Sequence, residues 1–478
     1  MGCFMQGLKK TLSSIDMTEG PPWQKLLLFT VPLLVGNLFQ QLYGTADAIM
    51  LGRFVGDYAL AAVGSSMPIF FLIMVLLMGI AMGAGIVVSQ YFGARRREEL
   101  SYTIGNSISI TAIMGVFMMI FGPLLTRPLL NMLSTPYVIL DESVLYMNIL
   151  LWGILGMAYF FVLSGILRSL GDAFSPLLYL VIACLLNIAL NFTFIVILGW
   201  GVPSVAAGTV LAQGFSSILC LRRLLKMQDT FDMGWKYLLP KKQYCMQVLK
   251  LGVPSGAAQA VIAIAGMVVQ PLVNNFGPMV IATNVIVMQI DRFVMMPVFS
   301  FGNAITVYAG QNMGAGKVDR VSQGTKQSLY MAVGTAAILL IGILLFGRFI
   351  AMAFTETQEI IDLSQRMIRI IAFGYIPFTI GMVLWGAVRG AGDALSPMWA
   401  SVVNTVVVRV PTAYLFVYWM GIPEAIVVSM VAAWSVNMLL AVLIYRIGKW
   451  RTMSIVRGRR PTGPPSGEAA DEGHEQFS

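Results

Sequence analysis

Long apolar segments, separated by short polar interruptions, follow one another along almost the whole chain. Each is close to the ~20 residues that an α-helix needs to cross the hydrocarbon core of a bilayer. We therefore predict twelve membrane-spanning helices, of which the second and the eighth continue beyond the bilayer to about Gln90 and Gln311. Their approximate ranges are 26–51, 59–82, 102–126, 143–164, 176–199, 203–221, 247–271, 279–302, 328–347, 368–387, 395–419 and 422–445.

The chain also repeats itself. The stretch RSLGDAFSP, Arg168–Pro176, returns 221 positions later as RGAGDALSP, Arg389–Pro397, and the pattern Gln-x-x-Gly-Ala occurs at Gln90 and Gln311 with the same offset. Several matches at one offset indicate two homologous halves of six spans each. Because six is even, both halves have the same orientation, so an axis along the membrane normal relates them.

The predicted fold is an all-α integral membrane protein of twelve transmembrane helices, with two six-helix lobes related by a pseudo-two-fold along the membrane normal. Its divisions are a cytoplasmic N-terminal segment 1–25, an N-terminal lobe 26–221, a cytoplasmic basic linker 222–246, a C-terminal lobe 247–447 and a basic, then acidic and disordered cytoplasmic tail 448–478.

Charges in the loops orient the chain. Basic residues gather after the even-numbered spans, as at Arg95, Arg96 and Arg97, whereas most odd-numbered loops are poor in lysine and arginine. By the positive-inside rule both termini are cytoplasmic. We therefore expect a multi-pass protein of the cell (inner, cytoplasmic) membrane.

Composition agrees with a membrane protein and excludes several classes. Of the 478 residues 58% are hydrophobic and 11% charged, and the mean hydropathy is +0.80; soluble domains carry about 25% charged residues. The net charge of +9 arises mostly from loops, so no nucleic-acid partner is expected. The single histidine, His474, lies in the tail, and the four cysteines form no Cys-x-x-Cys pair. We expect no metal site, no cofactor and no enzyme activity.

Acidic residues inside the spans are the main candidates for function, because each costs at least ~2.5–3.5 kcal/mol at the centre of a span. Asp47 ends a series with Asn37, Gln40 and Tyr43, spaced by three or four residues and therefore on one helix face, with Gln41 beside it. We expect this face to point into the bundle. The alternative is that Asp47 reaches water from the outer end of its span.

Other polar residues lie in later spans. Asn187 and Asn191 form an i, i+4 pair that suits either cation coordination or hydrogen bonding between helices. Asp291 lies near the middle of its span, and Asn284 is two turns earlier on the same face. An ion pair of Asp291 with the adjacent Arg292 or with Arg409 is the structural alternative to a role in transport.

The repeated Gly-Asp-Ala turns lie on the predicted cytoplasmic side. Their occurrence in both halves favours a structural role as tight turns and helix caps. We expect Asp172 to pair with Arg168, four residues earlier, and Asp393 to pair likewise with Arg389.

Five stretches resemble the multidrug and toxic compound extrusion (MATE) family, in particular its bacterial multidrug efflux members, over nearly all of the chain except the tails. They are QQLYGTADAIMLGRFVG (Gln40–Gly56), ILRSLGDAFSP (Ile166–Pro176), NIALNFTFI (Asn187–Ile195), VYAGQNMGAGKVDRV (Val307–Val321) and AVRGAGDALSP (Ala387–Pro397). The resemblance implies two six-helix lobes and export of cationic or amphipathic drugs against inward H⁺ or Na⁺.

The resemblance also implies roles for residues. Asp47 falls on the family's first-helix aspartate, which is tied to ion coupling, and Asn187 on an asparagine near it. Asn191 departs from the pattern Asn-Ile-x-Leu-Asp of many relatives, which removes one acid from this lobe. Proton coupling is then favoured over a Na⁺ site with several anionic ligands.

We therefore predict a monomeric secondary active multidrug efflux antiporter that works by alternating access of its two lobes. The ion-coupling residues are Asp47, Asn187 and Asn191; the residues of the substrate cavity are Gln40, Gln41, Tyr43, Asn284 and Asp291; and the structural polar residues are Arg292 and Arg409. The alternatives are a flippase for lipid-linked oligosaccharides or precursors in the same superfamily, a passive channel and a membrane enzyme.

Overall fold

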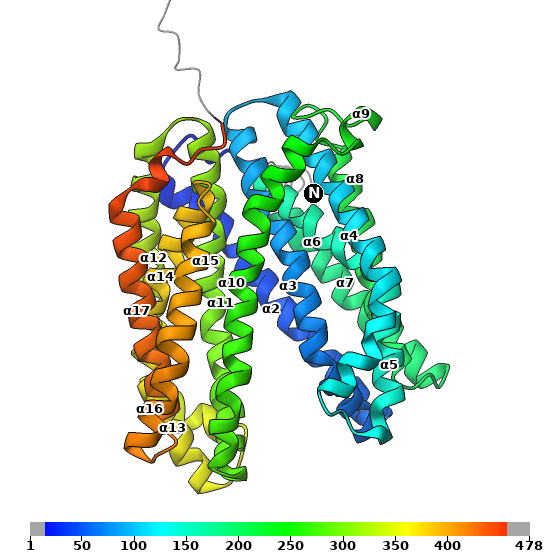
Figure 1. Ribbon diagram of the computed structural model, residues 1–478, viewed down its shortest axis with the longest axis vertical. Helices are drawn as coiled ribbons and strands as arrows, with labels where there is room; N and C mark the ends of the chain where they lie inside the picture. The colour runs from blue at the N-terminus through cyan, green and yellow to red at the C-terminus, as the bar shows by residue number, and fades with distance from the viewer. Residues whose placement is uncertain (1–14, 457–478) are drawn as a thin grey trace, which may run out of the picture.

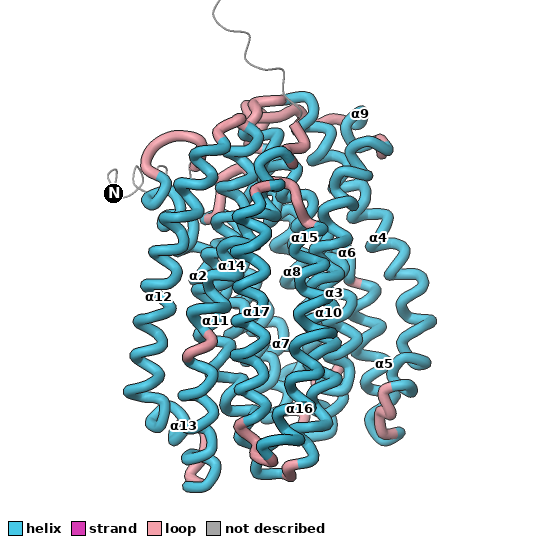
Figure 2. Tube along the Cα trace, turned by 60° about the vertical axis from the view of Figure 1, so that its left-hand side comes forward, coloured by secondary structure: helices cyan, strands magenta, loops and turns pink. Residues whose placement is uncertain are grey.

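The computed structural model describes residues 15–456, which form helices joined by short connections and contain no strand (Figure 2). Ten helices of this part are long and apolar enough to cross a membrane. Two bent pairs of helices bring the number of spans to as many as twelve. The predicted fold class is confirmed, and the predicted tail beyond residue 456 and the first 14 residues lie outside the described part.

The N-terminal lobe occupies the right side of Figure 1 and the C-terminal lobe the left side. The first lobe contains α2 (Pro22–Phe54), α3 (Asp57–Gly93), α4 (Arg97–Met132), α5 (Tyr137–Trp152), α6 (Ile154–Ser169), α7 (Phe174–Phe192) with the π-helical turn η1 (Thr193–Ile197), and α8 (Pro203–Leu225). The second contains α10 (Lys242–Asn275), α11 (Pro278–Gly314), α12 (Val318–Met352), α13 (Gln358–Ala372), α14 (Tyr375–Gly390), α15 (Leu395–Val403) with the π-helical turn η2 (Asn404–Arg409), α16 (Val410–Met420), α17 (Ala425–Ile447) and the 3₁₀ turn η3 (Lys449–Thr452).

The two lobes touch most closely at the end of the bundle that carries the chain termini. There α3 and α11 extend past Gln90 and Gln311, as predicted, and cross. A Cβ atom on Gly93 would lie 1.9 Å from the carbonyl oxygen of Gln311, and one on Gly314 would lie 1.8 Å from that of Gln90. Only glycine allows the two backbones to approach so closely. Toward the opposite end the lobes diverge (Figure 1).

The bent spans repeat between the lobes. The α5–α6 pair bends by 52° at Gly153, and the α13–α14 pair bends by 44° at the connection that holds Gly374. These glycines are 221 positions apart. Two ion pairs at the divergent end repeat with the same offset, arginine for arginine and aspartate for aspartate. Those pairs are Arg127–Asp141 at 2.5 Å and Arg348–Asp362 at 2.7 Å. Two of the arginines on the predicted outer side are therefore neutralised by local acids.

The predicted pairing within the Gly-Asp-Ala turns is wrong. Asp172 accepts hydrogen bonds from the backbone N–H and the hydroxyl of Ser175, and its ion pair is with Arg223 at 2.7 Å, rather than with Arg168. Asp393 likewise binds Ser396 rather than Arg389.

The reason is that each helix ends before its aspartate. Gly171, with φ +91°, and Gly392, with φ +106°, turn the chain, so the i, i+4 geometry that would join arginine and aspartate is lost. The predicted capping role is the one that the contacts support, since each aspartate binds the first turn of the next helix.

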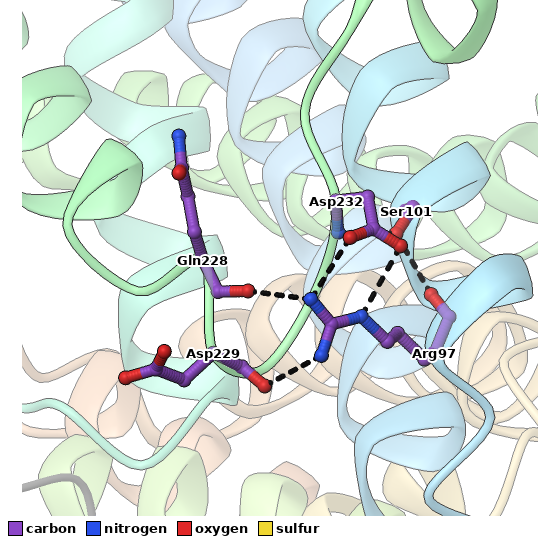
Figure 3. Close-up of polar contacts among 5 residues, drawn as sticks. All are labelled: Arg97, Ser101, Gln228, Asp229 and Asp232. Atoms are coloured by element: carbon purple, nitrogen blue, oxygen red, sulfur yellow. Dashed lines mark hydrogen bonds and ion pairs between the residues drawn. The ribbon is translucent and has the colours of Figure 1, made fainter.

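The segment between the lobes is shorter than the predicted linker, because α8 continues to Leu225 and α10 begins at Lys242. It includes the short helix α9 (Trp235–Leu238) and lies against α4. Arg97 binds the carboxylate of Asp232 and the carbonyl oxygens of Gln228 and Asp229 (Figure 3). The linker is thus attached to the N-terminal lobe.

Replacing Arg97 with glutamine should loosen the part of this linker around residues 228–232, since one guanidinium binds three of its residues. We expect trypsin to cut at Lys226 or Lys236 several times faster in Arg97→Gln than in the wild type, with cleavage sites identified by mass spectrometry. The matched control is Arg95→Gln, whose ion pair with Glu19 is exposed and does not involve the linker.

The same attachment should depend on pH. The hydrogen bond with Arg97 lowers the pKa of the Asp232 carboxyl below its usual value. The stabilisation of the linker by the Asp232–Arg97 ion pair is therefore complete above the ordinary aspartate pKa of about 3.9 and is lost as the pH falls through the lowered value.

Equal trypsin cleavage of Arg97→Gln and wild type would contradict the role of Arg97 in holding the linker.

Candidate functional site

Asp47 lies on the face of α2 that packs against α7 of the N-terminal lobe and faces Thr209 of α8. Its Oδ1 atom accepts a hydrogen bond from the Asn191 amide at 2.7 Å, and its Oδ2 atom lies 3.5 Å from the Thr209 hydroxyl. The carboxylate is therefore held by neutral donors from two other helices, and Asp47 is half-buried.

The side-chain amide of Asn187 also faces Asp47. It can take two orientations, which exchange the positions of its nitrogen and its oxygen. Its nearest amide atom lies 2.7 Å from Asp47 Oδ1. If this atom is the nitrogen, it donates to an ionised carboxylate, and the amide oxygen accepts from the Tyr43 hydroxyl at 3.1 Å. If it is the oxygen, it accepts from Asn191 at 3.3 Å, and its contact with Asp47 requires a proton on the carboxyl group.

The packing of α8 determines where the Asn191 amide lies. A Cβ atom on Gly208 would lie 2.0 Å from Asn191 Oδ1, so glycine is the residue that leaves room for this side chain. Both asparagines are fully buried. Asn191 Oδ1 has no hydrogen-bond partner among the described residues, which leaves an oxygen available in the pocket.

The electrostatic setting of Asp47 is unusual for a half-buried acid. Its neighbours are amides, hydroxyls and the buried rings of Tyr43 and Tyr146, with no cationic side chain among them in the described range. Within the same range no group of three or more histidine, cysteine, aspartate or glutamate side chains gathers to hold a metal ion. A partly buried carboxylate without a cationic partner costs free energy unless neutral donors bind it, which is the role of the amides and hydroxyls here.

The polar face of α2 is divided between two surroundings. Tyr43 and Asp47 face the interior of the N-terminal lobe, whereas the amide of Asn37 donates to the Ser300 hydroxyl of α11 at 3.0 Å. Gln40 is exposed and Gln41 half-buried, and neither side chain hydrogen-bonds to another described residue. The structure thus joins Asp47, Tyr43, Asn187 and Asn191 but leaves both glutamines outside the group.

A second, different polar group lies in the C-terminal lobe. Asp291 of α11 lies near the hydroxyl of Tyr375 and within electrostatic reach of Arg409 at the end of η2. No ion pair within 4.0 Å forms at Asp291 in the described part of the chain, so the direct pair considered from the sequence is absent. Arg292 is exposed, and Asn284 is half-buried with no side-chain hydrogen bond among the described residues.

Sequence reasoning missed Thr209, Gly208 and Tyr375. One signal was present for the first two: they follow Ala206 and Ala207 in an apolar span, and runs of small residues in membrane helices mark close packing. Tyr375 gave no such signal, because an aromatic residue at the start of a membrane helix is common.

A protein-family model described as MatE matches residues 32–193 and 254–415, one segment in each lobe. Similar curated proteins include "Probable multidrug resistance protein YoeA" of Bacillus subtilis, which is 29% identical over 89% of this chain and 96% of its own length. "Probable multidrug resistance protein NorM" of Thermotoga maritima is 25% identical over 91% of this chain and 95% of its own.

Solved structures share the fold. One, described as the outward-facing conformation of a multidrug resistance MATE family transporter of the MOP superfamily, has a TM-score of 0.86 and 24% identity. It matches 91% of this chain and 98% of its own. At this identity the likeness shows the fold, including its two lobes, and nothing about substrates.

Gly208→Ala should disturb the site without changing its polar groups. The added methyl group would clash with Asn191 and move it away from Asp47, and overpacking of this kind costs about 1–3 kcal/mol. We expect a thermal unfolding midpoint several degrees below that of the wild type, measured in detergent. Gly214→Ala on the same helix is the control, because its Cβ would meet nothing within 4 Å. Equal midpoints for the two variants would show that Asn191 is not held by this contact.

Proposed function

The chain belongs to the MatE family, whose members are membrane transporters rather than enzymes, and from that premise we propose that it is a secondary active multidrug efflux antiporter. It exports cationic or amphipathic small molecules in exchange for H⁺ by alternating access of its two lobes. The names of its relatives support drugs as substrates. We further propose that it works as a monomer in the cell membrane, with both termini in the cytoplasm.

One observation carries the proposal: the half-buried carboxylate of Asp47 lies among neutral hydrogen-bonding groups from α7 and α8. Such a carboxylate can take up a proton, since partial burial penalises its charge and no cationic side chain of the described residues hydrogen-bonds to it or forms an ion pair with it. It lies on α2, which also packs against α11 and α12 of the opposite lobe. A change of charge at Asp47 therefore acts on a helix that contacts both lobes.

The Asn187 amide supports H⁺ as the coupling ion. Its nitrogen suits the ionised form of Asp47 and its oxygen suits the protonated form, so a rotation of one side chain satisfies both states. A Na⁺ ion prefers several oxygen ligands, usually with more than one negative charge. Asp47 is the single acid in this group, because position 191 is asparagine. The site is better suited to a proton than to Na⁺.

In the antiport cycle, proton uptake neutralises Asp47 and changes how α2 packs on α7 and α8. Release of the drug on one side and of the proton on the other requires that each ligand bind the two conformations unequally. Asp291 in the C-terminal lobe is the further acid that we propose for contact with the drug, since its Oδ1 atom has no partner among the described residues.

Asp47→Asn should abolish ion-driven exchange, because an amide cannot take up and release a proton near neutral pH. The measurement is efflux of ethidium from proteoliposomes driven by a pH gradient or by a Na⁺ gradient applied separately. We expect wild-type exchange with the pH gradient alone and at least a tenfold loss in the variant. Asp57→Asn, which changes an exposed acid at the start of α3, is the control and should behave as wild type.

A second variant tests the choice of ion. Asn191→Asp restores the acid found in many relatives and places two carboxyl groups beside each other, so we expect exchange to gain dependence on Na⁺. Unchanged pH-driven exchange in Asp47→Asn would remove Asp47 from the mechanism. Na⁺-driven exchange by the wild type would overturn proton coupling while leaving antiport intact.

A further inference from the structure

We infer that two short segments at the ends of the described chain are paired straps that hold one end of the two lobes together and oppose opening of the transporter at that end. The N-terminal strap is residues 15–20, and the C-terminal strap is residues 453–456. This inference rests on the proposed alternating access, because a strap matters only if the lobes separate there.

Two buried glutamines connect the lobes and the straps. Gln311 of α11 donates from Nε2 to the carbonyl oxygen of Ser169, where α6 of the other lobe ends, at 2.9 Å. Gln90 of α3 donates to the carbonyl oxygen of Gly390, where α14 ends, at 3.0 Å. Both side chains are fully buried. Each glutamine therefore crosses from its own lobe to a helix end of the other lobe, and the two contacts are related by the internal repeat.

The remaining oxygen of each glutamine holds a strap. Gln311 Oε1 accepts from the backbone N–H of Met17 at 2.9 Å, and Gln90 Oε1 accepts from that of Ile455 at 2.8 Å. One side chain thus binds the opposite lobe and a terminal segment at the same time. Breaking either contact leaves a buried amide group without a partner, which is the costly outcome for a hydrogen bond.

The N-terminal strap joins the two lobes by itself. At its start, Ile15 donates to the carbonyl oxygen of Gly171 in the N-terminal lobe at 3.0 Å. Further along, its carbonyl oxygens accept from side chains of the C-terminal lobe. Those bonds are Asn312 to Met17 at 3.1 Å, Lys317 to Thr18 at 3.0 Å and Arg320 to Gly20 at 2.5 Å. The Met17 side chain is fully buried.

The C-terminal strap also contacts both lobes. It follows η3 of the C-terminal lobe, and the carbonyl oxygen of Met453 lies against the Gly392 turn, where a Cβ atom would be 2.6 Å away. Beyond that turn Ile455 and Val456 pack on a hydrophobic cluster that residues of both lobes form, most of them from the N-terminal lobe. Ile15 lies against the matching Gly171 turn, where a Cβ atom would be 2.3 Å from its carbonyl oxygen. Both repeated turns therefore receive a strap.

Position along the chain links the N-terminal strap to the proposed ion site. Helix α2 begins at Pro22, just after this strap, and carries Asp47 in its second half. A movement of α2 caused by protonation would therefore pull on the strap. The straps set how readily the end opens when the charge of Asp47 changes.

The test separates the straps from the direct contacts between lobes. The side chains of Lys317 and Arg320 hydrogen-bond to the N-terminal strap and to no residue of the described N-terminal lobe, so Lys317→Ala/Arg320→Ala loosens the strap without removing a direct hydrogen bond between the lobes. The reporters are single cysteines at Met17, inside the strap, and at Ser89, which lies between α3 and α11 next to Gly310. They are placed in a variant whose native cysteines are replaced by serine, and reaction with a thiol reagent is timed in detergent.

We expect the labelling rate of both reporters to rise about tenfold in the double variant. The variant loses charge-assisted hydrogen bonds, and a loss of about 1.4 kcal/mol raises the population of the open, reactive state tenfold. Gln311→Leu should raise Ser89→Cys labelling further. The matched control, Lys250→Ala/Lys326→Ala, removes two exposed lysines that do not touch a strap and should leave labelling unchanged.

Faster labelling at Met17→Cys without any change at Ser89→Cys would overturn the inference, because the strap would then open without the lobes. General unfolding is detected by a variant that keeps only Cys220, which is fully buried in the N-terminal lobe; its labelling should stay slow. The labelling needs no transport, so loss of ion-driven exchange and failure of the straps are distinguishable results.

Discussion

A charged group inside a membrane bundle has no bulk water to solvate it, so its partners have to come from the protein. Asp47 shows how the fold meets this constraint with neutral groups alone. The carboxylate is on α2, two amides are on α7, and a hydroxyl and a glycine are on α8. The site exists only when these helices pack, and Gly208 decides how near the Asn191 amide can come. The shape of the N-terminal lobe and its chemistry therefore depend on each other.

The internal repeat distinguishes features that occur in both lobes from features that occur in only one. The bent spans, the ion pairs of Arg127 and Arg348 and the crossing glutamines recur at one offset. All of these contacts shape or join the lobes. The polar groups inside the lobes do not recur: one lobe holds Asp47 with amides, and the other holds Asp291 near Tyr375 and Arg409. Duplication thus preserved the architecture, while the interior of each lobe has its own chemistry.

The two ends of the bundle are built differently. At the end with the termini, glycines let α3 and α11 cross at backbone distance, and buried amides and chain segments add to the contact. At the other end, the lobes diverge and each has its own ion pair between neighbouring helices. The closest backbone contacts between the lobes lie at the end with the termini, and α3 and α10 continue this close packing as far as Gly79 and Gly252. Helix α2 runs from the first end toward the second and carries Asp47 between them.

Local patterns determined much of this protein. Runs of about 20 apolar residues require membrane helices, a repeat at offset 221 requires two like lobes, and an acid on a polar helix face requires an interior partner. The tertiary structure decided which residue is the partner of each acid. The expected pair of Arg168 and Asp172 failed because the helix ends at Ser169, and the binding of Asp172 to Arg223 joins residues 51 positions apart. Thr209 reaches Asp47 across 162 positions. Such contacts depend on how helices are arranged against one another, which the periodicity of a single helix does not encode.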